Sequence, residues 1–181
     1  LSFEGWDPNV QFTGQQGLGR IATLACILGI LWGVHFAMTI MLTVNLYKNN
    51  LGSLALSETL GESRVQLLCQ WCLYVVLFCT FHLLEFFVTA IYNPTVTSAD
   101  SFLVNHSMGY TAAVLSSTTE FWIRLALFPS FQNGYIFEFG FGMVILAQIL
   151  RSVSMATCGE SFNHRIQTSK KENHTLITHG M

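Results

Sequence analysis

The sequence predicts an all-α protein, a polytopic bundle of transmembrane helices, on three observations. Of 181 residues, 51% are hydrophobic and only 10% carry charge, whereas a soluble domain has about 25% charged residues. The apolar residues form runs that match the roughly 20 residues a helix needs to cross a bilayer core. Because lipid offers no hydrogen bonds to an open chain's backbone, each run is expected to be helical.

The first span is expected over residues 21–47, which contain no Asp, Glu, Lys or Arg. Within it, Gly29 and Gly33 have a spacing that would let another helix approach closely. Glycines are common in membrane helices, so the same spacing is also consistent with an ordinary lipid-facing position. Before this span, residues 1–20 form the N-terminal tail.

The second span is expected over residues 65–92, which are rich in Leu, Phe and Cys, and it ends where Asn93 and Pro94 break the helix. It carries His82 and Glu85 three positions apart. Because an ionisable group inside a membrane is costly, these two side chains are expected either to satisfy each other or to face a polar cavity between helices.

Two further spans complete a transmembrane region over residues 21–156. The third is expected over residues 102–131, where Glu120 and Arg124 lie four positions apart and are expected to pair within their helix. The fourth is expected over residues 135–155.

Basic residues predict the orientation of the bundle. Arg165, Lys170 and Lys171 cluster after the fourth span, which favours the cytosolic side for residues 157–181. With four spans, the N-terminal tail is then cytosolic as well.

Composition also excludes several classes of function. A net charge of -2 supplies no basic surface for nucleic acid, so no nucleic-acid partner is expected. The five cysteines are an odd number, and most lie in apolar runs, unlike a secreted disulfide framework. Cys69 and Cys72 have no second ligand pair, so no metal site is expected.

Arg151 lies a turn or two from the end of the fourth span, and no acidic residue lies within one turn of it. Its side chain is therefore expected either to extend to the lipid headgroups or to bind an anionic ligand, which the planar guanidinium suits.

Three stretches carry a resemblance to a known family: FHLLEFFVTAIYNP with DSFLVNHS (residues 81–94 and 100–107), LRSVSMATCGESFNHRIQ (150–167) and HTLITHGM (174–181). From about Cys69 onward, the chain resembles isoprenylcysteine carboxyl methyltransferases. These integral membrane enzymes methylate the C-terminal prenylcysteine of CaaX proteins. Residues 1–68 resemble the family only in being hydrophobic and helical.

The resemblance implies a site and a location. Arg151 corresponds to the family's membrane-embedded catalytic arginine, which orients the substrate carboxylate. Residues 157–181 would begin the cofactor-binding region. S-adenosylmethionine is expected to contact residues that match the family's cofactor pattern, namely Gln167, His174, Thr175, Leu176 and Ile177. Farnesyl- or geranylgeranyl-cysteine proteins would be the partners, in the endoplasmic reticulum membrane.

The match has one departure. In the family, the stretch aligned with HTLITHGM continues into an Arg-His-Pro-x-Tyr motif, two more membrane helices and a cytosolic tail, none of which follows Met181. The chain by itself is therefore expected to be inactive.

Two rival functions remain at this point. The first is an intramembrane sterol reductase that uses NADPH. The second is a non-enzymatic scaffold or channel-like bundle in which Glu85, Glu120 and Arg124 line a polar path.

Overall fold

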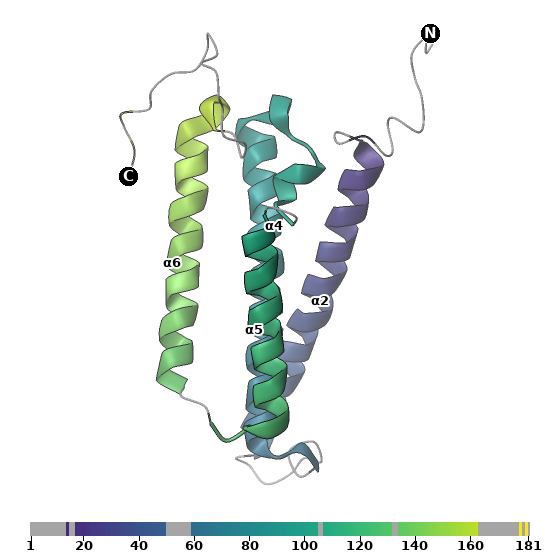
Figure 1. The fold of residues 1–181 in the computed structure, drawn as a ribbon, viewed down its shortest axis with the longest axis vertical. Coiled ribbons are helices and arrows are strands. Elements are labelled where there is room, and N and C mark those ends of the chain that lie inside the picture. The colour runs from purple at the N-terminus through teal and green to yellow at the C-terminus, as the bar shows by residue number, and fades with distance from the viewer. Residues whose placement is uncertain are drawn as a thin grey trace. The chain divides into compact units, whose positions relative to one another are not determined.

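The computed structural model describes residues 14, 17–49, 59–104, 107–131, 134–162, 178 and 180. No strand occurs among these residues, so the prediction of an all-α fold is confirmed. The elements, in chain order (Figure 1), are α2 (Leu18–Asn49), α4 (Glu62–Tyr92), η1 (Pro94–Val96), η2 (Ala99–Phe102), α5 (Met108–Leu127), α6 (Gly134–Cys158) and η3 (Gly159–Ser161), where η marks a 3-10 helix.

Three stretches of helix in the described part of the chain are long and apolar enough to cross a membrane. They cover Leu18–Tyr47, Glu62–Tyr92 and Gly134–Ser161, with 30, 31 and 28 residues. At most 22% of the most apolar window of each is buried inside the protein, so most of these side chains face outward, as lipid-facing side chains do. The protein is therefore a multi-pass membrane protein, and these stretches coincide with the first, second and fourth expected spans.

The third expected span differs from the structure. α5 has 20 residues and begins at Met108, so the prediction of a helix from residue 102 was wrong. The chain turns at Leu103, whose φ of 56° is left-handed. The hydroxyl of Ser107 then caps α5 by accepting a hydrogen bond from the backbone N–H of Tyr110 at 3.1 Å. α5 is not among the described helices that are long and apolar enough to cross a membrane, so a fourth crossing stays a prediction.

The helices contribute to two compact units, of which one comprises Leu28–Thr80 and Asn105–Tyr135. In this unit, an apolar cluster joins α2 to α4, with Leu42, Val65 and Cys72 buried at its centre. Trp71 of α4 stacks on Phe121 of α5, with 4.7 Å between ring centroids.

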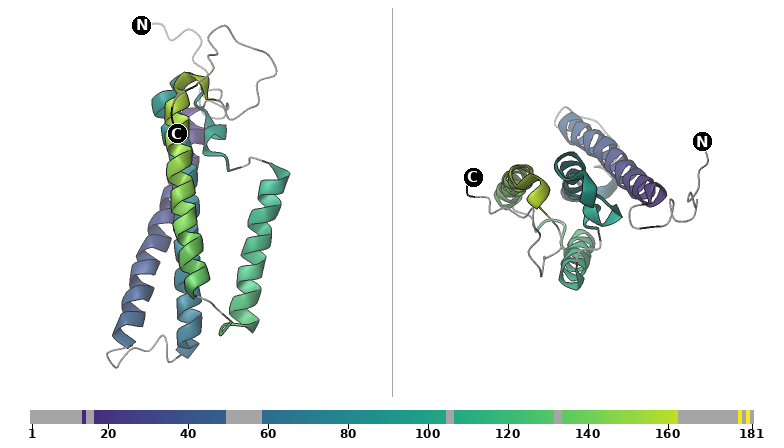
Figure 2. Two further views of the ribbon diagram at one scale, coloured as in Figure 1. Left: turned by 90° about the vertical axis from the view of Figure 1, so that its left-hand side faces the viewer. Right: turned by 90° about the horizontal axis from the view of Figure 1, so that it is seen from above.

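The other unit comprises Leu1–Ile27, Phe81–Val104 and Ile136–Met181. Here η2 folds back onto α4, because the Phe102 ring stacks on that of Phe86 with 4.3 Å between centroids and an interplanar angle of 5°. α6 lies beside this part of α4 (Figure 2). This unit holds every residue of the candidate site described below.

Candidate functional site

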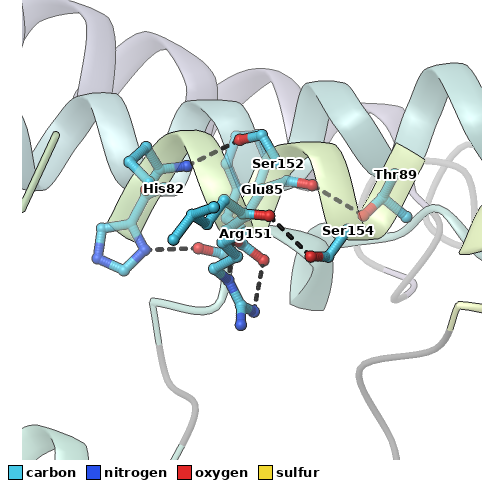
Figure 3. A network of polar contacts seen from close by, with 9 residues as sticks. His82, Glu85, Thr89, Arg151, Ser152 and Ser154 are labelled. Carbon is cyan, nitrogen blue, oxygen red and sulfur yellow. Dashed lines mark hydrogen bonds and ion pairs between the residues drawn. The ribbon is translucent and has the colours of Figure 1, made fainter. Parts of the chain in front are cut away.

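Arg151 of α6 and Glu85 of α4 form a bidentate ion pair (Figure 3). The Arg151 Nε donates a short hydrogen bond to Oε1 of Glu85, and Nη2 donates to Oε2 at 2.9 Å. The Glu85 side chain is 0% exposed, whereas that of Arg151 is 42% exposed. A buried carboxylate is costly unless it is paired, so the guanidinium supplies the counter-charge that Glu85 needs.

Glu85 lies on a buried polar face of α4. His82, Glu85 and Thr89 are all at most 2% exposed, and their spacing of three and four residues places them on one side of the helix. The Thr89 hydroxyl donates to the backbone carbonyl of Glu85 at 2.8 Å. The local sequence thus turns a polar stripe of an otherwise apolar helix toward the interior of its unit.

His82 fastens α4 to the segment that follows it. Its Nδ1 lies 2.6 Å from the backbone carbonyl of Phe102. Because a carbonyl only accepts, Nδ1 must carry the proton. The sequence left open whether His82 and Glu85 satisfy each other or face a cavity; in the structure, Glu85 pairs with Arg151 and His82 donates to Phe102.

The hydrogen bonds of Arg151 within the described part of the chain go to Glu85 alone, through Nε and Nη2. The Phe81 ring lies 5.8 Å from the Arg151 Cζ, within the range of a cation–π contact. The charge of Arg151 is thus met inside the protein rather than only at the headgroups. Sequence reasoning missed Glu85 as a partner because it compared charges within one helical turn.

The expected pair on α5 does not form. No ion pair joins Glu120 to Arg124, both of which are described residues. Glu120 is exposed, whereas Arg124 is half-buried and its Nε, within the described residues, is buried without a hydrogen-bond partner. Favourable spacing alone was therefore insufficient, because the two side chains lie in different surroundings.

Asn93 connects the end of α4 to the chain that leaves α6. Its side chain is buried at 3% exposed, and Nδ2 donates to the carbonyls of Glu160 at 3.0 Å and Phe162 at 2.9 Å. Gly159 makes the preceding turn with a φ of +52°, which glycine adopts readily. These two hydrogen bonds therefore hold Glu160 and Phe162 in the unit that contains Arg151.

The predicted cofactor residues Gln167, His174, Thr175, Leu176 and Ile177 lie outside the described residues. Their contacts with S-adenosylmethionine stay predictions. Arg151 is described, but its catalytic role is likewise a prediction that the geometry alone does not test.

Comparison with known proteins finds similarity to one family. A family model described as isoprenylcysteine carboxyl methyltransferase matches residues 140–181. A protein-S-isoprenylcysteine O-methyltransferase of Xenopus laevis is 43% identical over 109 residues, covering 60% of this chain and 38% of the relative. The Dictyostelium discoideum enzyme of the same name is 38% identical over 109 residues, covering 60% of this chain and 46% of the relative.

The family model and both relatives agree that this chain is similar to isoprenylcysteine carboxyl methyltransferases. A solved structure of a eukaryotic intramembrane Ras methyltransferase, an isoprenylcysteine carboxyl methyltransferase, is also similar. It is 29% identical, with a TM-score of 0.58, and the match covers 96% of this chain and 70% of that one. The chain spans less than half the length of the two curated relatives named above. The resemblance inferred from the sequence is confirmed.

Proposed function

We propose that this chain serves the transfer of a methyl group from S-adenosylmethionine to the C-terminal carboxylate of prenylated cysteine in CaaX proteins. The observation that carries the proposal is the half-exposed side chain of Arg151, which lies in the segment matched by the family model and is paired with the buried side chain of Glu85. A guanidinium held in this way suits the planar, two-oxygen geometry of a carboxylate.

In the proposed methyl transfer, the role of Arg151 is to orient the substrate carboxylate and not to transfer a proton. A free α-carboxyl group has a pKa of about 3.3 to 3.7, so it is ionised at neutral pH and needs no general base. When bound, S-adenosylmethionine supplies an electrophilic methyl group on its sulfonium. Holding the carboxylate in line is the contribution expected of Arg151, and such alignment is worth about 7 to 11 kcal/mol in favourable cases.

The end of α6 is held in the same unit as Arg151, because Asn93 donates a hydrogen bond to the carbonyl of Phe162. In sequence, Phe162 lies five residues before Gln167, the first position that the family pattern assigns to the cofactor. We assign Gln167, His174, Thr175, Leu176 and Ile177 to that site on the sequence match.

A membrane location fits the proposed substrate. The prenyl chain can stay in lipid along the exposed apolar faces of the helices, while the cofactor arrives from the cytosol. Methylation removes one negative charge from a protein held by a single lipid, whose attachment is marginal. Stronger attachment is the expected result, and the endoplasmic reticulum is the proposed membrane.

The rival functions have less support. The relatives named above are methyltransferases, which favours a methyl donor over NADPH. The channel-like bundle required Glu85 to line a polar path, but its carboxylate is buried against Arg151.

The test is a transfer assay on full-length protein that carries this sequence, in detergent or liposomes. With radiolabelled S-adenosylmethionine, we expect label on N-acetyl-S-farnesylcysteine. The methyl ester of the same compound is the control and should accept none, because its carboxylate is blocked. Folded protein that labels neither compound would overturn the proposal.

A further inference from the structure

We infer that Glu85 is a positioning residue, which binds one edge of the Arg151 guanidinium and leaves the other edge for the carboxylate of the substrate. The inference rests on the proposed function. It adds Glu85 of α4 to the proposed site. It also defines how the carboxylates of Glu85 and of the substrate are arranged around the Arg151 guanidinium.

The donor geometry of arginine carries the first step. A guanidinium holds five N–H bonds in one plane. Glu85 takes the side edge, which consists of Nε and Nη2. The end of the fork, with one N–H on Nη1 and one on Nη2, has no hydrogen-bond partner among the described residues and matches a second carboxylate.

Burial supplies the second step. The Glu85 side chain is 0% exposed, whereas 42% of the Arg151 side chain is exposed. An incoming substrate therefore reaches the arginine and not the glutamate. A carboxylate bound at the end edge can add to the existing pair without displacing it.

Two further contacts lie beside this ion pair. The Phe81 ring lies 5.8 Å from Cζ of Arg151. The hydrogen bond from His82 to the Phe102 carbonyl ties this part of α4 to η2. The side chain that presents the end edge is thus held by Glu85 and bordered by Phe81.

Charge supplies the third step. An uncompensated guanidinium would bind the substrate carboxylate tightly, and such ground-state binding lowers turnover. The negative charge of Glu85 offsets part of that attraction. Glu85 therefore serves both to orient Arg151 and to keep its hold on the nucleophile loose.

The experiment compares Glu85→Gln with wild type in full-length protein, using N-acetyl-S-farnesylcysteine as substrate. We expect kcat to fall by at least about tenfold and the KM for the farnesylcysteine to fall as well, because the bare guanidinium binds it more tightly. The KM for S-adenosylmethionine should not change. Glu138→Gln is the matched control, since Glu138 is an exposed carboxylate on α6, and it should behave as wild type.

Glu85→Asp keeps the inference testable if Glu85→Gln does not fold. It retains the charge but is one methylene shorter, so it moves the guanidinium; we expect a lower kcat with a thermal midpoint near that of wild type. Wild-type kcat and KM in either folded variant would overturn the inference. Wild-type protein without methyl transfer would instead overturn the proposed function, so the two failures are distinguishable.

Discussion

Glu85 and Arg151 lie 66 residues apart in the chain, and their side chains meet in a bidentate ion pair between α4 and α6. The two members differ in surroundings, because the Glu85 side chain is fully buried and the Arg151 side chain is 42% exposed. Because of this difference, we expect the loss of Arg151 and the loss of Glu85 to change the free energy of unfolding by different amounts.

The first prediction concerns stability. Arg151→Ala leaves a buried carboxylate without its counter-charge, and breaking a buried pair in this way costs about 3 to 5 kcal/mol. Glu85→Ala should cost less, because the exposed part of Arg151 can reach water or headgroups. Unfolding followed by circular dichroism in detergent measures both losses. An equal or larger loss for Glu85→Ala would contradict the asymmetry.

The second prediction concerns Asn93. Asn93→Ala removes two hydrogen bonds to the carbonyls of Glu160 and Phe162, and each buried group left unsatisfied costs about 1 to 3 kcal/mol. Because these bonds hold the start of the proposed cofactor segment, we expect the KM for S-adenosylmethionine to rise, with a smaller effect on the KM for farnesylcysteine.

Thr95→Val is the matched control for Asn93. It removes only the hydrogen bond from Thr95 to the Asn93 side-chain oxygen. It should leave the cofactor KM near that of wild type. A cofactor KM that Asn93→Ala does not change would show that this anchor is structural alone.

The third prediction concerns the packing of η2 on α4. Phe102 is 0% exposed and stacks on Phe86, so Phe102→Ala should cost about 3 to 5 kcal/mol through the cavity it leaves. Phe87→Ala is the control, because Phe87 is 52% exposed and should cost much less. Similar thermal midpoints for the two variants would contradict the described packing.

The long helices could be predicted from the sequence because lipid imposes a simple pattern. Long apolar runs with few charged residues indicated α2, α4 and α6, and Pro94 indicated the end of α4. The start of the third helix could not be predicted in this way. Phe102 and Leu103 resemble the first residues of a span in hydropathy, yet Phe102 packs on Phe86 and the chain turns at Leu103. That outcome depends on a contact with a distant residue.

The sequence predicted only part of the candidate site, because the site also depends on a contact between residues that are distant in the chain. Arg151 stood out as a charge in an apolar run without a local partner, and that description was correct. Its partner lies on another helix, and spacing rules for a single helix do not reach it. Those rules also predicted the pair of Glu120 and Arg124 that the structure does not contain. Both outcomes, the pairing of Arg151 with Glu85 and the missing pair of Glu120 with Arg124, depend on how the folded chain buries these side chains.

The most direct test of the account is the turnover of Arg151→Lys in full-length protein. Lysine keeps the positive charge beside Glu85, so the variant should fold and bind S-adenosylmethionine as wild type does, but it lacks the planar fork that orients a carboxylate. We predict that kcat for N-acetyl-S-farnesylcysteine falls by at least about a hundredfold, the scale expected for a misplaced reacting group. A folded Arg151→Lys variant with wild-type kcat would contradict the role of Arg151.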